Sequence, residues 1–260
     1  MSNALRIAAT GMNAQQKNVD VLANNIANIS TTAFKRSEAA FSDLMFNNEI
    51  AAGAVTTREG SLAPTGSQIG TGVKLASTYR VQTQGAVEET GDAFSMAIQG
   101  RGFFEISLPN GDTAYTRDGN FGLDEDGNIV TKEGFELEPN IVVPEDATNI
   151  TISARGIVSA TIDQDVVELG EIDLVMFQNP AGLESLGENL FRETEVSGDP
   201  VIVEPDEDGA GTLLQGFIER SNVDPVQEIT RLITAQRSYE LNSRVISTAD
   251  EMLSAVNQIR

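Results

Sequence analysis

Residues 5–29, LRIAATGMNAQQKNVDVLANNIANI, decide the fold class of this 260-residue chain. Within this stretch eight positions follow one another at alternating intervals of three and four residues, and all but Gln15 are apolar. These positions are Leu5, Ala8, Met12, Gln15, Val19, Leu22, Ile26 and Ile29. A heptad spacing kept over more than three heptads predicts an α-helix with one apolar seam. We expect Ser30, Thr31 and Thr32 to end it, because such residues favour turns.

The carboxy-terminal stretch, residues 224–260, predicts a second helix. Asp224 suits the N-cap, Pro225 the first helical position and Gln227 a capping box. Beyond these residues, two sets of positions each recur every seven residues. Together they form a second heptad seam. They are Leu232, Tyr239, Ile246 and Leu253, then Ala235, Asn242, Ala249 and Val256.

The middle of the chain, residues 86–212, has a different pattern. Short apolar runs alternate with the turn signals Asn110-Gly111, Asp118-Gly119 and Asp126-Gly127. The runs are Met96–Ile98, Phe103–Leu108, Ile141–Val143, Ile150–Ile152, Ile157–Ile162, Ile172–Phe177 and Val201–Val203. Dipeptides of this kind permit tight hairpins. The chain is therefore predicted to be an α+β protein with long terminal helices and a central antiparallel β-rich domain.

Domain boundaries follow from these changes of pattern. Residues 1–35 and 222–260 are expected to form a terminal helical domain, and 86–212 the β-rich domain. Residues 36–85 are expected to be an extended or loop-like connection, with an insert at about 47–66 that is rich in Gly, Ala, Ser and Thr. A stretch of that length without a period suggests a functional segment. Residues 213–221 are expected to be the return connection.

Composition excludes several classes of function. The chain has no Cys, His or Trp and a net charge of −22. The absence of His and Cys removes the commonest general base and the thiolate metal ligands, and the negative charge disfavours nucleic acid and anionic membranes. The charge is concentrated in residues 86–212, which hold five basic and twenty-eight acidic side chains, a net of −23.

No targeting or membrane signal is visible. The first ten residues lack the apolar core of a cleavable signal peptide, and no apolar run approaches the ~18 residues that span a bilayer.

Motifs that could carry chemistry have plainer interpretations. Residues 123–128 resemble the start of a calcium loop, but position 135 is Phe where that loop needs Glu, so a β-turn is expected. Gly100 and Gly102 lack the third glycine of a dinucleotide site and are expected to form a tight strand connection. Many carboxylates could pair as in a hydrolase, but no spacing selects one pair. We expect no enzyme activity, no cofactor and no metal.

The two seams suggest self-assembly. The helices could pair within one chain, but apolar residues such as Ile229, Ile233, Val245, Met252 and Ile259 would still need a partner. Neighbouring copies could supply it, or both helices could pack on the β-rich domain of the same chain. An adhesive or ligand-binding β module with coiled-coil ends is the alternative from another class. The polar seam residues Gln15 and Asn242 could fix register or face a wet channel.

Three longer stretches resemble the axial proteins of the bacterial flagellum. Residues 22–36, LANNIANISTTAFKR, are similar to the amino-terminal signature of flagellar rod and hook proteins. Residues 98–104, IQGRGFF, and 115–121, YTRDGNF, resemble the β-domain signature of this family, and 235–243, AQRSYELNS, its carboxy-terminal signature. The similarity runs, with gaps, over nearly the whole chain.

Within the family, the chain is most similar to the distal rod type. Residues 68–73, QIGTGV, and 182–190, GLESLGENL, carry this similarity, and the insert at 47–66 corresponds to one that distinguishes straight rod from flexible hook. A hook or proximal rod protein is the near alternative. The resemblance implies a structural subunit of the distal rod, which polymerises into a rigid helical tube. That tube would transmit torque for motility and house the export channel.

The resemblance also implies partners and location. The terminal helices would form a coiled-coil-like tube core, with the β-rich domain outside. Partners would be further copies of the chain, proximal rod proteins, the hook protein and the periplasmic and outer-membrane ring proteins. The subunit would sit in the basal body, in a rod that spans the periplasm, after type III export without a cleaved signal peptide.

A set of residues is expected at the subunit interface. They lie on the two seams and at the end of the first helix, where the asparagines could either bond a neighbour or cap the helix. They are Leu5, Met12, Val19, Leu22, Asn24, Asn25, Ile26, Asn28, Ile29, Leu232, Tyr239, Asn242, Ile246, Leu253 and Val256.

Overall fold

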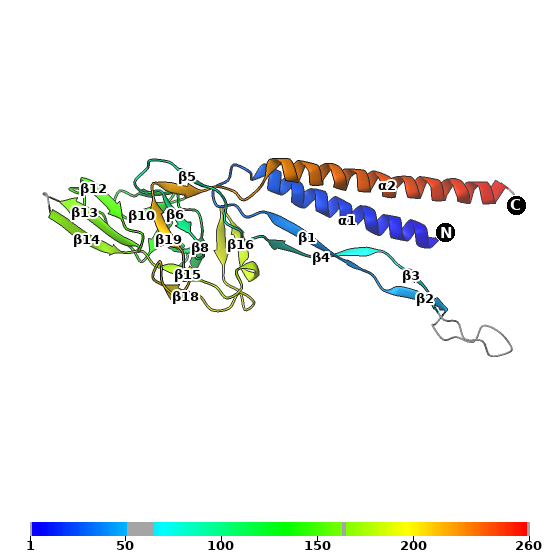
Figure 1. The fold of residues 1–260 in the computed structure, drawn as a ribbon, viewed down its shortest axis with the longest axis horizontal. Coiled ribbons are helices and arrows are strands. Elements are labelled where there is room, and N and C mark those ends of the chain that lie inside the picture. The colour runs from blue at the N-terminus through cyan, green and yellow to red at the C-terminus, as the bar shows by residue number, and fades with distance from the viewer. Residues whose placement is uncertain (1, 51–64, 163–164, 259–260) are drawn as a thin grey trace. The chain divides into compact units, whose positions relative to one another are not determined.

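The structure is a computed structural model that describes residues 2–50, 65–162 and 165–258 (Figure 1). The chain folds into two compact units. Unit 1 comprises Met1–Ala27, Ser37–Tyr79 and Asp224–Arg260, and unit 2 comprises Asn28–Arg36 and Arg80–Val223. Helices occupy both ends of the chain and strands the middle, which confirms the α+β class.

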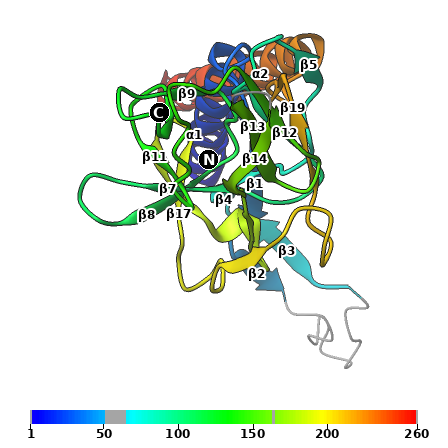
Figure 2. The same cartoon turned by 90° about the vertical axis from the view of Figure 1, so that its left-hand side faces the viewer.

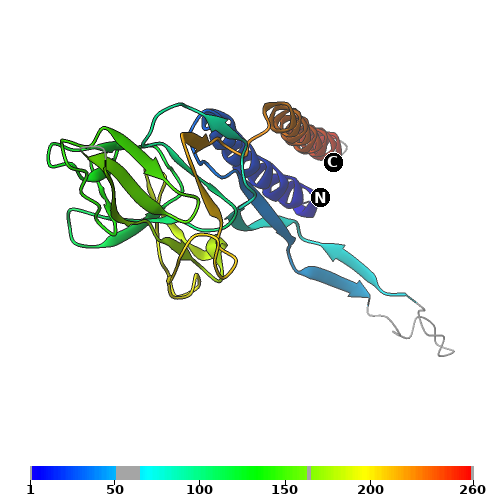
Figure 3. The same cartoon turned by 60° about the vertical axis from the view of Figure 1, so that its left-hand side comes forward.

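Unit 1 contains the two long helices, α1 (Ser2–Ala27) and α2 (Pro225–Gln258). They lie side by side and run in opposite directions (Figures 1 and 3). The predicted N-cap is confirmed, since the Asp224 Oδ1 accepts bonds from the amides of Val226 at 2.9 Å and Gln227 at 3.3 Å.

The first helix ends earlier than expected, at Ala27 rather than at Ser30. The cause is local hydrogen bonding that competes with the helix. The amide of Thr31 donates to the carbonyl of Asn28 at 3.2 Å, and the Thr31 hydroxyl donates to the Asn28 side chain at 3.1 Å.

The remainder of unit 1 is formed by paired strands. They are β1 (Ser37–Asp43), β2 (Phe46–Ile50), β3 (Ser67–Gly70) and β4 (Val73–Arg80), of which only Arg80 belongs to unit 2. β1 pairs with β4, and β2 pairs with β3 in antiparallel register. Residues 47–50 at the start of the predicted insert therefore lie in β2, and β3 begins directly after its end, while residues 51–64 lie outside the described residues.

Unit 2 is built from short strands, with one 3-10 turn, η1 (Pro180–Gly182). They are β5 (Val87–Glu89), β6 (Met96–Gln99), β7 (Phe104–Ser107), β8 (Thr113–Thr116), β9 (Phe121–Leu123), β10 (Ile129–Thr131), β11 (Glu136–Glu138), β12 (Asn149–Ile152), β13 (Ile157–Ile162), β14 (Asp165–Glu171), β15 (Leu174–Met176), β16 (Glu184–Gly187), β17 (Leu190–Arg192), β18 (Val201–Val203), β19 (Thr212–Gln215) and β20 (Phe217–Glu219).

These strands pair in antiparallel fashion, as predicted. In the described part of the chain the largest sheet has seven strands in the order β16-β17-β8-β7-β11-β10-β9, and β12, β13 and β14 form another (Figure 2). Two further pairs join β19 to β6 and β20 to β5. The segment expected as a return connection, residues 213–221, thus contains strands that pair with the start of the β-rich region.

Two of the three predicted turn dipeptides close hairpins. Asn110-Gly111 joins β7 to β8, and Asp126-Gly127 joins β9 to β10, where the Gly127 amide donates to the Asp124 carbonyl at 3.0 Å. The third prediction was wrong, because β8 and β9 do not pair with each other. Gly119 is needed there for close approach, since a Cβ at this position would lie 1.4 Å from the Met96 carbonyl oxygen.

One apolar run does not form a strand. Residues 141–143 make only an isolated bridge, between Val142 and Asn128. Pro139 and Pro144 flank this run, and proline has no amide to donate to a ladder.

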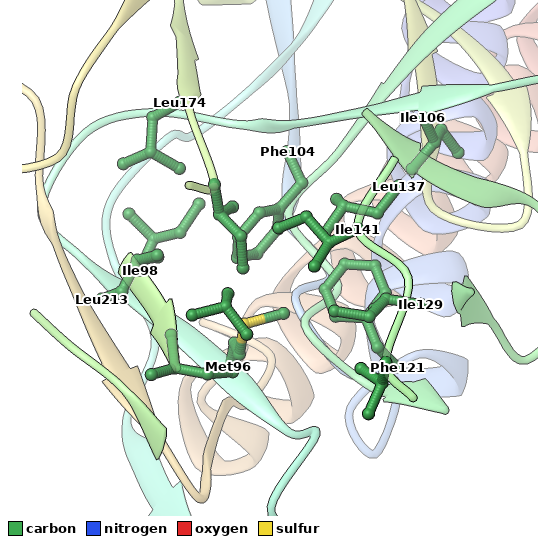
Figure 4. Close-up of a cluster of buried hydrophobic side chains, with 14 of the residues drawn as sticks. Met96, Ile98, Phe104, Ile106, Phe121, Ile129, Leu137, Ile141, Leu174 and Leu213 are labelled. Carbon is green, nitrogen blue, oxygen red and sulfur yellow. The ribbon is translucent and has the colours of Figure 1, made fainter. Parts of the chain in front are cut away.

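The main hydrophobic core of unit 2 lies between its sheets. Side chains from β6, β7, β9, β10, β11, β15 and β19 meet in it (Figure 4). A second cluster lies on the other face of the large sheet, around Phe103, Tyr115 and Phe177. On β8 the neighbours Ala114 and Tyr115 enter different clusters, because successive strand residues point to opposite faces.

Candidate functional site: the terminal helices and the Glu219 cluster

The predicted seams face each other within unit 1. Three small side chains of the seams are buried, Ala8, Ala235 and Ala249, as is Leu22. Small residues at these places let the two helices approach closely. The heptad pattern therefore identified the contact surface between α1 and α2 of a single chain.

The residues predicted for a subunit interface divide by exposure. Leu22 and Asn25 are buried within the chain, while Asn24 and Tyr239 are exposed. The half-buried members are Leu5, Met12, Val19, Ile26, Asn28, Ile29, Leu232, Asn242, Ile246 and Leu253. Val256 lies in α2, but its side chain is outside the described residues. Their role between copies stays a prediction.

The helices come particularly close at Gly11 and Asn242. A Cβ added to Gly11 would lie 2.9 Å from the Asn242 Nδ2 and 3.2 Å from its Cγ. Asn242 is thus a polar residue inside the seam, as predicted, and it occupies the space that a side chain at position 11 would need.

Outside the seam, the surface of α2, here called its exposed face, carries several apolar side chains that are about half exposed in the described chain. Ile229, Ile233, Val245 and Met252 are each 46–48% exposed. Val226 and Leu241 extend this face and are more exposed still. A helix in a monomeric protein usually carries polar residues on its outer side, so an apolar outer face indicates a site for a further contact.

A groove of about 410 Å³ adjoins the seam in unit 1. α1 contributes Leu22 to its lining, β1 contributes Phe41, and α2 contributes Thr234 and Ala235. The groove is thus bounded by both helices and by β1.

Asn25 ties the end of α1 to the start of β1 and to α2. Its Nδ2 donates to the Ser37 carbonyl at 2.9 Å, and its Oδ1 accepts from the Ser37 amide at 2.8 Å. The same Nδ2 also reaches the buried Glu228 at 3.1 Å. Asn25 therefore links three segments of unit 1.

A buried ion cluster lies in unit 2 and consists of Lys35, Arg117 and Glu219, hereafter the Glu219 cluster. The Lys35 Nζ bonds to the Glu219 Oε1, and the Arg117 Nε lies 2.6 Å from the Glu219 Oε2. The three side chains are at most 8% exposed. The Arg117 guanidinium also donates to the carbonyls of Gly100 and Gly102 in the β6–β7 connection. The two motif glycines are thus part of this arrangement.

Burial and charge act in opposite directions on this cluster. Burial lowers the pKa of the Lys35 ammonium below its ordinary value, against the attraction of Glu219. Burial would raise the pKa of the Glu219 carboxyl, but the charges of Arg117 and Lys35 outweigh it and hold that pKa below its ordinary range. Glu219 is therefore ionised at neutral pH.

Sequence reasoning missed this cluster. Lys35 and Arg117 stand inside the signature stretches, but each lies beside another charged residue, Arg36 or Asp118, so their local surroundings carried no signal of burial. Glu219 had no signal either, because it lies 184 residues from Lys35 and 102 from Arg117.

The acidic surface of unit 2 includes two carboxylates opposite each other on neighbouring strands. Glu105 on β7 is in register with Glu138 on β11. Burial raises the pKa of the Glu105 carboxyl, and the charges of Glu138, Glu193 and Asp173 raise it further. Like charges directly opposite on a sheet are unfavourable.

No metal site is apparent in the residues that the structure describes, since no three acidic side chains there are arranged to hold an ion. In the same residues, neither helix has an apolar stretch long enough to cross a membrane.

Comparison with known proteins agrees with the geometry. Three protein-family models match: "Flagella basal body rod protein" at residues 5–35, "Flagellar hook protein FlgE/F/G D1 domain" at 97–160, and "Flagellar basal body rod FlgEFG protein C-terminal" at 214–259. These matches cover both terminal helices and much of unit 2, and they define the class as the flagellar rod and hook proteins.

Relatives identify the family more closely. The flagellar basal-body rod protein FlgG of Caulobacter vibrioides is 50% identical, and the alignment covers 99% of each chain. FlgG of Agrobacterium fabrum is 48% identical over 98% of each chain, and FlgG of Buchnera aphidicola from Acyrthosiphon pisum is 46% identical over the full length of both. The chain belongs to the FlgG family of flagellar basal-body rod proteins.

Family membership establishes the general function. The chain is a structural subunit of the flagellar distal rod, in the basal body, and not an enzyme. The family implies self-assembly and contact with neighbouring flagellar components.

Proposed function

We propose that the helices of unit 1 form the coiled-coil-like core of a rigid helical tube built from many copies of the chain. The observation that carries this proposal is the set of exposed apolar side chains that α2 carries outside the seam. One partner helix, α1, already covers the seam, so the second face needs a partner from another copy.

The energy available from this face supports assembly. Complete burial of a side chain such as Ile or Met contributes about 1.5–3 kcal/mol relative to exposure. The four residues Ile229, Ile233, Val245 and Met252 are about half exposed. Burial of the remaining surface could contribute roughly 1 kcal/mol for each, repeated in every subunit of a polymer.

The charge distribution supports a radial arrangement. The acidic residues 86–212, with a net charge of −23, lie in unit 2, whereas the terminal segments are close to neutral. Near-neutral helices can crowd together, while acidic units repel one another and favour water. We therefore assign the helices of unit 1 to the core and unit 2, which holds residues 86–212 together with 28–36, 80–85 and 213–223, to an outer domain.

The predicted interface residues of both helices would line contacts within and between copies in this tube. Its ends would meet proximal rod proteins on one side and the hook protein on the other, with the periplasmic and outer-membrane ring proteins around it. A tube of this kind would transmit torque and enclose the export channel.

A pair of substitutions on α2 tests the core. Ile233→Asp places a charge on the exposed face, and Ile246→Asp places one in the seam against α1. We expect Ile233→Asp to abolish tubes while the monomer keeps its helix content. Ile246→Asp should abolish tubes and also reduce helix content, because it disrupts packing within the chain.

The readouts are electron microscopy, sedimentation and circular dichroism. Ser243→Asp, at an exposed polar position of the same helix, is the matched control and should assemble normally. Normal tubes from Ile233→Asp would contradict the proposal that the exposed face of α2 is a subunit interface.

A further inference from the structure

The Glu219 cluster is not needed to explain an assembly surface, since all three side chains are buried in unit 2. It joins segments that are distant in sequence. Lys35 follows the first helix, Arg117 follows β8, and Glu219 ends β20, shortly before the second helix. Its role must therefore concern how these distant segments of unit 2 are held together.

Each partner in the cluster depends on the single carboxylate. The Glu219 Oε1 accepts from the Lys35 ammonium and from the Gly85 amide at 2.8 Å, and the Oε2 accepts from Arg117. Two cations thus share one anion, and all three side chains are almost fully buried. Removing one partner of a buried ion pair leaves an uncompensated charge, which is among the most destabilising changes a protein can undergo.

The backbone around the cluster makes the same connection. Two stretches, residues 28–36 and 217–223, are called here the closing segments. The Ala33 amide donates to the Glu219 carbonyl at 2.8 Å, and the Asn222 amide donates to the Phe34 carbonyl at 3.3 Å. The Asn222 Oδ1 accepts from the Arg36 amide at 2.8 Å. The closing segments therefore bind each other as well as the sheets.

Asn222 also extends this connection to a third stretch. Its Nδ2 donates to the carbonyls of Val81 and Thr83, at 2.8 and 2.9 Å, and the Lys35 Nζ donates to the same Thr83 carbonyl. The start of the β-rich region is thereby held by groups from both closing segments.

We propose that the Glu219 cluster is a folding latch, by which the two closing segments of unit 2 become ordered together or not at all. Lys35 cannot be buried without Glu219, because desolvation of an ammonium without a counter-charge is too costly. Glu219 in turn has two of its donors in residues 28–36 and 80–85. The closing segments of unit 2 therefore cannot become ordered until the chain beyond residue 217 is available.

Hydrogen exchange on the full-length chain tests the latch. Lys35→Met removes one cation and leaves a neutral Arg117–Glu219 pair, so unit 2 can still fold. We expect amides of residues 28–36 and 217–223 to exchange about tenfold faster or more, and by similar factors, which is the change expected from losing one charge-assisted hydrogen bond. The sheet formed by β12, β13 and β14 should be unaffected.

Glu219→Gln provides the stronger variant, because it leaves Lys35 and Arg117 without an anion. We expect trypsin to cleave after Arg36 and Arg220 in this variant but not in the parent. Glu88→Gln is the matched control, since it removes an exposed carboxylate, paired with Arg220 at 3.1 Å on the adjoining strand pair. It should behave like the parent.

Two outcomes would overturn the latch. In one, Lys35→Met accelerates exchange in residues 28–36 alone and leaves 217–223 protected. In the other, Glu219→Gln matches Glu88→Gln in exchange and proteolysis. If either cluster variant fails to fold while Glu88→Gln folds, the result supports the latch, because closure then depends on the buried ions.

Discussion

At Gly11 the two terminal helices are so close that the size of one side chain decides their packing. A methyl group there requires only that the amide end of Asn242 moves, whereas a branched side chain would enter the space between the helices. Alanine also favours a helix over glycine by about 1 kcal/mol. Position 11 should therefore tolerate alanine and reject a larger, branched side chain.

Gly11→Leu is predicted to destabilise the helix pair by about 1–3 kcal/mol, the usual cost of overpacking. Gly11→Ala, the matched control, should be close to neutral. Thermal unfolding followed by helical circular dichroism measures both. Asn242→Ala should partly restore the stability of Gly11→Leu, and no such rescue would mean that Asn242 is not the neighbour that limits position 11.

Glu105 is expected to make the stability of unit 2 depend on pH. Its folded-state pKa lies above the ordinary 4.5, so its charge opposes folding at neutral pH. Stability from this group should rise as pH falls through the folded-state pKa, and the gain should be complete below the ordinary value. Glu105→Gln is predicted to add about 0.5–1 kcal/mol at pH 7 and little at low pH.

Urea unfolding at pH 7 and pH 4, followed by the near-ultraviolet signal of the buried Tyr115, measures this difference. Glu125→Gln, in the exposed β9–β10 turn, is the control. It should leave the difference in unfolding free energy between the two pH values unchanged. An equal gain from Glu105→Gln at both pH values would show that its charge is not the cause.

At the scale of elements, the N-cap residue Asp224 sets the start of α2. Asp224 accepts from two amides that would otherwise lack a partner at the start of the helix. Asp224→Ala is predicted to cost about 1 kcal/mol of helix stability, measured by thermal unfolding. Asp250→Ala, at an exposed interior position of α2, should leave stability unchanged or slightly higher, because Ala is the better helix former. Equal losses from both would exclude a capping role.

The terminal helices were the part of the fold most open to prediction. A heptad pattern is local, so residues such as Leu22 and Ala235 indicate by spacing alone which face is covered. The same spacing left Ile233 and Val245 outside the seam, and the structure leaves them about half exposed. The strands were predicted as a class, from apolar runs and turn dipeptides, but their pairing was not.

The pairing of the strands and the Glu219 cluster both depend on contacts between segments that are distant in the sequence. Asp118-Gly119 has the composition of a hairpin turn, yet Gly119 serves a close approach to Met96, on a strand that precedes it by twenty residues. Lys35, Arg117 and Glu219 each resemble an ordinary solvated charge in the sequence. Nothing in their local spacing indicates burial, because the partner that compensates each charge comes from another part of the chain.

For the whole molecule, the insert between β2 and β3 gives a prediction about the polymer. If this insert braces neighbouring subunits, deletion of residues 51–64 should give a curved, hook-like filament in place of a straight rod. The deletion leaves β2 and β3 intact, so the monomer should fold as before. Electron micrographs give curvature and bending stiffness, and a straight filament of unchanged stiffness would refute the bracing role.

Both ends of the chain belong to the helical unit, and this has a practical consequence for labelling. A fluorescent protein or affinity tag fused to either terminus is attached to a helix that carries the proposed contacts between copies. The turn at Asn110-Gly111 is exposed, and a Cβ at Gly111 would meet nothing within 4 Å. A short epitope inserted at that turn would report on the subunit in living cells without burdening the helices that we propose to carry the contacts between copies.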